Sequence, residues 1–345
     1  MTAAAGAAAR TRGRLRRWLP PLALLAVILL SFAVGKFPVP PADLLAVLWA
    51  KLTGSVANVP PTVETVVWQV RMPRVLAGIL VGAALAAAGA TYQGLFRNPL
   101  VSPDILGVSA GASLGAVLGI FLSLPVIAIQ GLAFLGGLGA VLVVYGIGAA
   151  VRNHDPILVL VLAGVAVGTL LGAAISLLKV LADPYNQLPA ITYWLLGSLT
   201  AVTTGDVAQT LPAILLGLLP LYLLRWRMNV MTLGEEEART LGVETVRLRA
   251  LFIGAATLMT AAAVSITGVI GWIGLLIPHM ARLLVGPDFA RLLPASLMLG
   301  AGYLVAVDAL ARTIGTIEVP IGILTAVLGA PFFLWLLATA RRGWQ

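Results

Sequence analysis

The sequence predicts an all-α protein that crosses a membrane ten times, and three observations support this fold class. Of its 345 residues, 60% are hydrophobic and only 10% are charged, with a mean hydropathy of +1.03. A water-soluble domain has about a quarter of its residues charged, so this chain lacks the composition for a water-facing surface. Its apolar runs are roughly 16 to 24 residues long without period-two alternation, which indicates membrane-spanning helices rather than strands.

The first apolar run follows a basic head in the stretch RTRGRLRRWLPPLALLAVILLSFAV. The same pattern is typical of a signal peptide, or of a twin-arginine signal through Arg16 and Arg17. The sequence has no small-x-small cleavage motif before Lys36, so we expect an uncleaved first span at 18–34. Residues 1–17 then form a basic N-terminal arm, which the positive-inside rule places in the cytoplasm.

Nine further apolar runs complete a single transmembrane domain at 18–340, followed by a short tail at 341–345. They lie at 75–95, 107–122, 127–150, 157–181, 207–224, 248–267, 269–285, 293–312 and 321–340. With ten spans, sixteen of the 22 Lys and Arg residues fall inside, and six fall outside: Lys36, Lys51, Arg71, Arg74, Lys179 and Arg312. We therefore expect both termini to be cytoplasmic, and the net charge of +9 to reflect topology rather than nucleic-acid binding.

Two predicted spans carry a strip of glycines on one helix face. Glycines recur every fourth residue in each: Gly107, Gly111, Gly115 and Gly119 in one, and Gly164, Gly168 and Gly172 in the other. Strips of this kind let helix backbones approach closely, so we expect both to pack inside the bundle.

Two segments are short and interrupted by proline: FRNPLVSPDILG at the start of the third span and GWIGLLIPHMARL in the eighth. They occupy matching places if the chain is a duplicated bundle of five plus five helices. Broken helices are tolerated in a membrane only where protein or a water-filled cavity surrounds them, so both segments are expected in the protein interior.

The residues that would power transport on this chain are missing or ambiguous. A phosphate-binding loop needs Gly-Lys followed by Ser or Thr, whereas Phe, Leu and Val follow the three lysines, Lys36, Lys51 and Lys179. Asp308 is a candidate proton relay, but Arg312 lies four residues later, and an ion pair is the simpler account. His279 is either a metal ligand or, more simply, a hydrogen-bonded structural residue. We expect no catalytic residue, no resident metal and no cofactor.

One dense block of charge, LGEEEARTLGVETVRLR, interrupts the apolar sequence on the cytoplasmic side. It predicts a short amphipathic helix at about 232–246, with Leu233, Ala238, Leu241 and Val243 against the membrane domain. Its charged residues, Glu235, Glu236, Glu237 and Arg239, would point into the cytoplasm. Such a helix suits a soluble partner, and a solvated loop helix without any partner is an equal alternative.

Four long motifs carry a resemblance to a known family. The runs RMPRVLAGILVGAALAAAGATYQGLFRNPLVSPDILGVSAGA, LGEEEARTLG, GWIGLLIPHMAR and VPIGILTAVLGAPFFLWLL closely resemble the permease family of iron-siderophore, haem and vitamin B12 ABC importers. The resemblance covers about 67–337, in order and without large gaps. It implies a ten-helix permease that works as a homodimer in a bacterial or archaeal cytoplasmic membrane.

The resemblance also implies partners. Two cytoplasmic ATPase subunits would bind ATP and Mg²⁺, one external binding protein would deliver a metal chelate, and the path would run along the dimer interface. The charge block resembles the coupling helix that seats in the ATPase, through Leu233, Gly234, Glu235, Glu236, Glu237, Ala238, Arg239, Leu241 and Gly242. The arginines that dock the binding protein match Arg71, Arg74 and Arg312, whose alternative role is to hold lipid headgroups.

The segment LADPYNQLPAITYWLLGSLT follows the fifth span on the outer side. It looks closer to subgroups that handle iron chelates, haem or oxyanions such as molybdate than to the vitamin B12 members. Tyr185, Asn186, Tyr193 and Trp194 are candidates to line the mouth of the path, or else form an ordinary aromatic belt. The rival functions are an ion-coupled secondary transporter that acts without an ATPase and, more distantly, a membrane scaffold.

Overall fold

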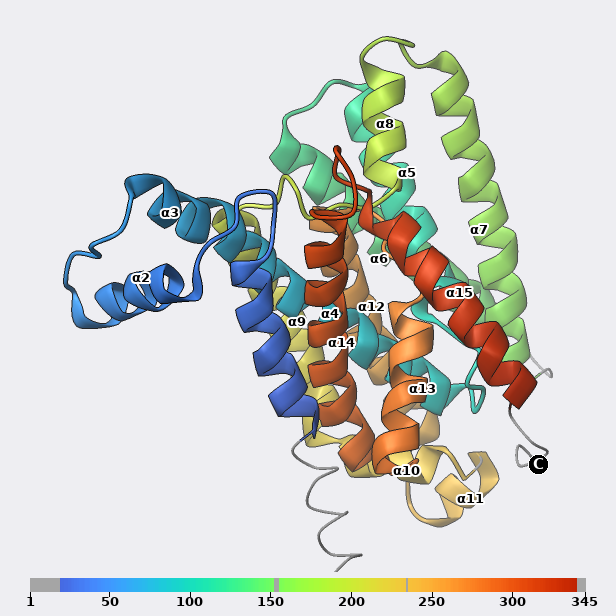
Figure 1. Cartoon of the computed structure of the whole chain (residues 1–345). Coiled ribbons are helices and arrows are strands. Elements are labelled where there is room, and N and C mark those ends of the chain that lie inside the picture. The colour runs from blue at the N-terminus through green and yellow to red at the C-terminus, as the bar shows by residue number, and fades with distance from the viewer. Residues whose placement is uncertain (1–18, 152–154, 234, 340–345) are drawn as a thin grey trace, which may run out of the picture.

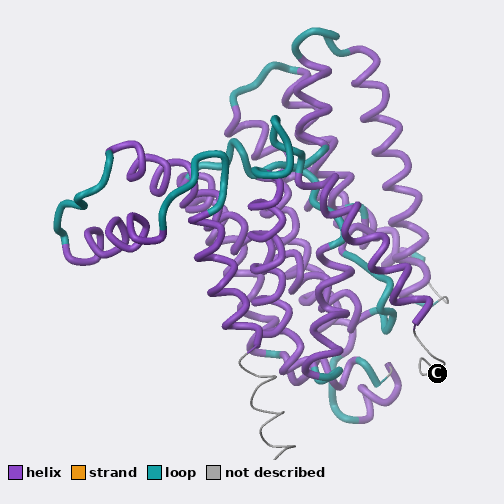
Figure 2. Tube along the Cα trace, viewed as in Figure 1, coloured by secondary structure: helices purple, strands orange, loops and turns teal. Residues whose placement is uncertain are grey.

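The computed structural model describes residues 19–151, 155–233 and 235–339, and these residues form a bundle of helices without strands (Figures 1 and 2). An unlabelled first helix at Leu19–Ala33 opens the bundle. The further elements are α2 (Pro41–Thr53), α3 (Pro61–Thr65), the π-helical turn η1 (Val66–Arg71), α4 (Met72–Leu95), the 3-10 turn η2 (Pro103–Leu106), α5 (Val108–Phe121), α6 (Val126–Ala150), α7 (Pro156–Leu181), α8 (Gln187–Leu195), α9 (Thr204–Leu223), α10 (Arg225–Met231), α11 (Glu235–Thr240), α12 (Thr245–Thr267), α13 (Ile273–Val285), α14 (Phe289–Ala311) and α15 (Ile321–Thr339).

Each predicted span coincides with a helix. Within the described ranges, six helical segments are long and apolar enough to cross a membrane, and four shorter apolar helices occupy the places of the remaining spans. A full crossing takes about 20 residues, so the helices are confirmed and the number of complete crossings stays a prediction. The basic arm at 1–17, the tail at 341–345 and His154 lie outside the described residues.

Helix α4 lies at the centre of the bundle. It packs most extensively against α14 and also contacts α12, α13 and α9. Of the most apolar window in the segment Pro61–Leu95, 78% is buried, against 17% for α7 and 22% for α6 and for α9. The last three helices therefore form the periphery, where a membrane protein meets lipid or a second subunit.

Small residues hold the central helices together by direct backbone contact. A Cβ at Gly82 of α4 would collide with the carbonyl of Gly300 in α14, and a Cβ at Gly89 would collide with the carbonyl of Gly274 in α13. Helices in lipid gain little by burying large apolar side chains against one another, because lipid tails are equally apolar. Close backbone contact therefore takes the place of interlocking large side chains.

The first predicted glycine strip is confirmed, and the second is confirmed only at its beginning. Cβ atoms at Gly111 and Gly115 of α5 would collide with backbone carbonyls of α6, and one at Gly164 of α7 would collide with the carbonyl of Ile105. Gly168 and Gly172, in contrast, face open space. The prediction that the whole second strip packs inside the chain is wrong, because Gly168 and Gly172 point away from neighbouring helices, although Ile175 and Leu178 farther along α7 pack against a core cluster.

Both predicted breaks exist, but the first lies only partly in the interior: Val101, Pro103 and Leu106 are buried, whereas Arg97 and Leu100 are exposed. The chain leaves α4, passes through η2 and starts again at α5, with η2 packed against α5, α7 and α12. The second break overlaps the start of its predicted segment: residues 268–272 are non-helical, with positive φ at Gly268 (69°) and Trp272 (71°). Pro278 lies inside the continuous helix α13.

We call the end of the bundle that carries α11 the inner end, following the predicted orientation, and the opposite end the outer end (Figure 1). Near the outer end, α2 and α3 form an arm that projects sideways from the bundle (Figure 1). A small apolar cluster that includes Leu44, Val47 and Val63 joins this arm to the base of α4.

Candidate functional site

An ion network closes the outer end of the bundle. Arg74 of α4 donates to Asp308 of α14 through Nε (3.1 Å) and through a terminal nitrogen (2.8 Å). The other terminal nitrogen of Arg74 donates to both carboxylate oxygens of Glu318, at 2.9 and 3.1 Å. Arg312 Nε lies 3.1 Å from Asp308 Oδ2, so the predicted ion pair between these two residues is confirmed. One guanidinium thus bridges two carboxylates on different segments.

The other two arginines tie the loop after the first helix to the bundle. Arg71 donates to the carbonyls of Phe32 and Phe37. Arg312 donates to the carbonyl of Ser31 at 3.2 Å and to its hydroxyl at 2.7 Å. These bonds satisfy carbonyls at the end of a helix, which have no intrahelical donor.

Arg71, Arg74 and Arg312, which the family resemblance offers as docking residues, do not project from the outer surface. Their relative exposures are 3%, 4% and 5%, because loop carbonyls and carboxylates from segments distant in sequence enclose them. A docking role for these arginines stays a prediction that this geometry does not favour. Within the network, the more accessible group is Glu318, whose side chain is 25% exposed.

Glu318 remains ionised through specific partners. Partial burial alone would raise its pKa, but the hydrogen bond from Thr200 Oγ1 (2.8 Å) and the Arg74 guanidinium outweigh burial and lower the pKa below its ordinary value. Lys36 adds a smaller favourable charge and donates to the carbonyl of Thr316 at 2.8 Å. The outer loop is therefore fixed by charge as well as by packing.

A helix lies where the coupling helix was predicted, but it is shorter than expected. Its helical core is α11, and the chain turns at Gly242, where φ is 76°. The amide of Val243 returns to the carbonyl of Ala238 at 3.0 Å, the closing bond typical of a glycine-terminated helix. Because of this turn, α12 begins separately at Thr245, and the expected single helix over 232–246 is wrong.

The faces of this segment differ in part from the prediction. Ala238 is buried and Val243 is partly buried against the main core, whereas Leu233 (58%) and Leu241 (62%) are exposed instead of touching the membrane domain. Glu236 and Glu237 are exposed as expected, as are Arg239 and Gly242. Gly234 and the side chain of Glu235 lie outside the described part of the chain.

A hydrogen-bonded joint that sequence reasoning missed anchors this segment. Asn229 of α10 donates to Asp288 Oδ1 at 2.7 Å, and its carbonyl oxygen accepts from the amide of Phe289 at 2.7 Å. Asp288 is the N-cap of α14 and also accepts from the amide of Ala290. The Gly-Pro-Asp sequence before an apolar helix is an N-cap signal that could have identified half of this joint.

The four candidate mouth residues do not form one cluster. Tyr185 is 86% exposed, and Asn186 precedes α8 with its amide bonded to Asp183. Tyr193 is exposed near the end of α8, while Trp194 packs beside a small core cluster of α5, α6 and α12. Only the first three are therefore accessible from the outer side of this chain.

Polar side chains support the interior breaks. Pro278 lacks the amide hydrogen that would bond the carbonyl of Gly274, and Gln93 Nε2 donates to this carbonyl at 3.4 Å and to that of Leu275 at 3.1 Å. Arg282 in turn donates to Gln93 Oε1 at 3.1 Å. His279 is buried nearby, and the described residues contain no group of three metal-binding side chains.

The fold and these features define a class: a polytopic membrane protein with a proline-broken interior, a clamped outer end and a charged segment at the inner end. The chain belongs to the FecCD transport family, whose model matches residues 23–339. The predicted family resemblance is therefore confirmed, and it extends beyond 67–337.

Individual relatives agree in fold and differ in cargo. The chain is 46% identical to the cobalamin import system permease protein BtuC of Halobacterium salinarum, covering 84% of this chain and 79% of the relative. It is 38% identical to the molybdate import system permease protein MolB of Haemophilus influenzae, covering 93% and 95%. A solved structure of a metal-chelate type ABC transporter in an inward-facing conformation matches with a TM-score of 0.83 and 36% identity, covering 93% of this chain and 98% of the other.

Proposed function

We propose that this chain is the permease subunit of an ATP-driven importer of metal chelates. In this proposal it works as a homodimer in a cytoplasmic membrane, with both termini inside. Two ABC ATPase subunits and one external binding protein complete the importer. The observation that carries the proposal is the match over 93% of the chain to a metal-chelate type ABC transporter, together with a charged segment at one end of the bundle. The chain moves the substrate, and the partner hydrolyses ATP.

The charged segment at the inner end, about residues 232–246 and called the inner segment below, is suited to receive force from an ATPase. Glu236, Glu237 and Arg239 form a charged surface, and the exposed Leu233 and Leu241 flank it as apolar anchors. A partner that moves α11 would move α14 through the Asn229 joint and α12 through Arg239 Nε, which donates to Thr245 Oγ1 at 3.3 Å. Rigid connections of this kind can convert closure of an ATPase into tilting of helices.

The peripheral helix α7 is suited to face the second subunit and the path. Gly168 and Gly172 leave a smooth strip on it that nothing in the described chain covers. Thr169 and Ser176 add hydroxyl groups on exposed parts of the same helix, although both hydroxyls bond the preceding turn. Tyr185, Asn186 and Tyr193 continue this surface to the outer mouth.

The cargo class follows from the relatives by similarity, and the molybdate relative makes an oxyanion the second candidate. A competition experiment in proteoliposomes that contain the permease, its ATPase and its binding protein separates them. We expect ATP-dependent uptake that excess cobalamin or a ferric siderophore inhibits and molybdate leaves unchanged. Inhibition by molybdate alone would assign the oxyanion, and uptake on an ion gradient without the ATPase would refute the proposal.

The ATPase contact has its own test. Glu236→Lys combined with Glu237→Lys should weaken association with the ATPase by about tenfold, because two rim charges are reversed at an interface. Glu64→Lys, on the exposed surface of α3 at the outer end, is the matched control and should bind normally. Unchanged co-purification of the double variant would place the ATPase contact elsewhere.

A further inference from the structure

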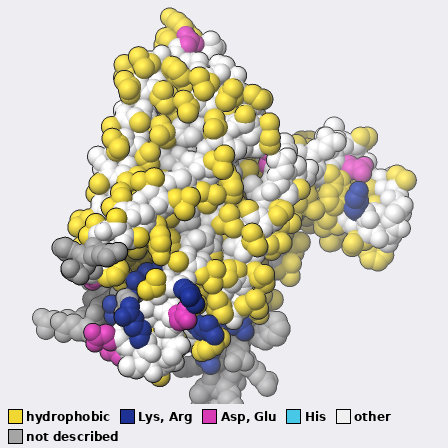
Figure 3. Space-filling view, turned by 180° about the vertical axis from the view of Figure 1, so that it is seen from behind, with side chains coloured by type: hydrophobic (Ala, Val, Ile, Leu, Met, Phe, Trp, Pro, Cys, Tyr) yellow, Lys and Arg dark blue, Asp and Glu magenta, His cyan; other side chains and the backbone are white. Residues whose placement is uncertain are grey.

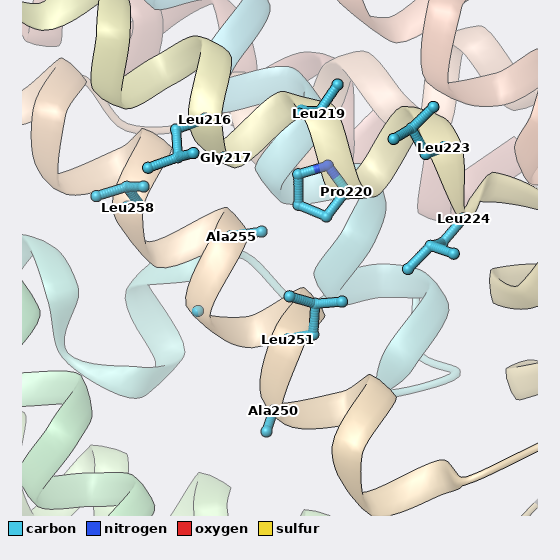
Figure 4. A pocket seen from close by; sticks show the side chains of 11 residues that line it. Leu216, Gly217, Leu219, Pro220, Leu223, Leu224, Ala250, Leu251, Ala255 and Leu258 are labelled. Atoms are coloured by element: carbon cyan, nitrogen blue, oxygen red, sulfur yellow. The ribbon is translucent and has the colours of Figure 1, made fainter.

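An apolar groove runs along the lipid-facing side between α9 and α12, near the inner end (Figure 4). It has a volume of about 580 Å³, and its walls are Leu219, Leu223 and Pro220 from α9 and Leu251 and Leu258 from α12. Figure 4 shows these side chains on facing sides of the groove. The described protein leaves this space open, and its lining is almost entirely hydrocarbon.

Two glycines explain the shape of the groove. Gly217 of α9 touches α12 so closely that a Cβ would lie 2.6 Å from the carbonyl of Ala255, which sets the point of closest approach. Gly254 of α12 has nothing within 4 Å of its Cβ position and forms an open part of the lining. The helices therefore touch at one level and leave a channel below it, towards the inner end.

Aromatic residues mark the depth of the groove in the membrane. Tyr222 near the end of α9 and Trp226 at the start of α10 are exposed, as expected for rings at a membrane–water interface. From Leu216 to Leu224 the groove follows roughly 12 Å of helix, at 1.5 Å per residue, which is close to the thickness of one leaflet's hydrocarbon, about 15 Å. The groove is thus long enough to hold most of an acyl chain that enters from this interface.

Two arginines lie at the inner ends of the helices that form the groove. Arg225 directly follows the lining residue Leu224, and its guanidinium carbon lies 4.2 Å from the centroid of the Tyr222 ring. A guanidinium in this place can fork onto a phosphate. Arg247 lies one turn before Leu251 on α12 and is 84% exposed, with an exposed partner, Glu244, at 2.7 Å. Figure 3 shows Lys and Arg side chains gathered at the inner end of this side, beneath an apolar surface.

From this arrangement we propose that the groove is a binding site for one anionic phospholipid of the inner leaflet. One acyl chain fills the channel between α9 and α12, and the phosphate lies between Arg225 and Arg247. The exposed ion pair of Arg247 with Glu244 is weak enough to exchange for a phosphate. The assignment to the inner leaflet rests on the proposed orientation of the permease, whereas the binding itself does not.

The position of this site gives the lipid a regulatory role. The groove lies at the base of the connection that runs from α9 through α10 and α11 to α12. A chain wedged between α9 and α12 would resist their sliding past one another when α11 is moved. The lipid would therefore set how tightly movement of the inner segment is coupled to these two helices.

Native mass spectrometry on the purified full chain tests the proposal, with dioleoyl phosphatidylglycerol and dioleoyl phosphatidylcholine as probes. The groove-filling variant is Gly254→Leu, whose side chain enters open space and whose backbone stays helical. Gly146→Leu on α6, also without a neighbour within 4 Å, is the matched control. We expect one phosphatidylglycerol retained per chain in the wild type and in Gly146→Leu, and its loss in Gly254→Leu.

A charge variant tests the headgroup contact separately. Arg225→Gln with Arg247→Gln should weaken phosphatidylglycerol binding by about 30-fold, from roughly fivefold for each basic residue, and leave phosphatidylcholine binding unchanged. Equal retention of lipid by Gly254→Leu and wild type, or equal affinity for the two lipids, would overturn the site. A dimer that dissociates in Gly254→Leu would identify the groove as an interface between copies instead. None of these measurements depends on the ATPase or on uptake, so failure of the proposed function would be seen independently.

Discussion

Replacing Arg74 with alanine removes the residue that joins the two carboxylates of the outer ion network. Arg74 is 4% exposed and bonds Asp308, which is 1% exposed, and Glu318, which is partly open to solvent. After the substitution, Asp308 keeps only Arg312 as a charged partner at its second oxygen, and its first oxygen loses both donors. The variant thus leaves a nearly buried carboxylate half-satisfied.

The expected cost follows from the difference between the two partners. Removing one member of a buried ion pair costs about 3–5 kcal/mol, because the remaining charge stays out of water. Losing the contact to the more exposed Glu318 adds at most about 1 kcal/mol, since water can replace the guanidinium there. We therefore expect Arg74→Ala to lower the free energy of unfolding by about 3–6 kcal/mol in total.

Unfolding of the purified chain in mixed micelles, titrated with dodecyl sulfate and followed by circular dichroism, measures this change. Glu318→Gln is the control on the exposed side of the network and should cost about 1 kcal/mol. If Arg74→Ala cost no more than Glu318→Gln, the ion network would not hold the outer end together. The burial argument would then be refuted.

Three further predictions concern packing, pH and the interior break. Gly111→Leu and Gly115→Leu should each destabilise the chain by about 1–3 kcal/mol through overpacking against α6. The control Gly168→Leu faces open space and should leave the stability of the monomer unchanged. Equal effects of all three variants in the same titration would refute the packing argument. The folded pKa of Glu318 lies below its ordinary value of 4.5. The contribution of ionised Glu318 to the free energy of unfolding should therefore be complete above that pH and disappear as the pH falls through the folded pKa. A wild-type advantage over Glu318→Gln that did not shrink as the pH was lowered from 4.5 would contradict this sign. Gln93→Leu should cost about 1–3 kcal/mol in the same titration by removing the donor to carbonyls in the first turn of α13, and a neutral result would mean that water satisfies them.

The sequence predicted the helices well because long apolar runs carry their own signal. The burial of Arg71 could not be predicted, since its acceptors are the main-chain carbonyls of Phe32 and Phe37. A carbonyl cannot be recognised in a sequence as the partner of a distant arginine, and only the fold brings this loop to Arg71. The family resemblance suggested a docking surface, whereas the long-range contacts of these arginines hold the outer end together.

The end of α11, in contrast, could have been predicted, because the sequence contains a helix stop signal at Gly242. Gly242 ends α11 in a left-handed conformation, and a glycine after a leucine at the end of a charged helix is a common stop signal. The exposure of Leu233 and Leu241 could not be inferred from periodicity, because six helical residues between two turns have no fixed facing direction. A pattern of apolar residues identifies a face only where a helix is long enough to keep it.

The backbone contacts of α4 with α13 and α14 make these helices one rigid block, a common frame that moves as a unit when force reaches α14. Where Gly82 meets Gly300 and Gly89 meets Gly274, no side chain lies between the helices that could change rotamer and allow one helix to slip. Packed contacts of this kind resist gradual deformation. Spectroscopic labels placed across α4 and α14 should therefore keep one separation in every state of the protein, and displacement is to be sought on α7, α9 and α15, measured against that frame.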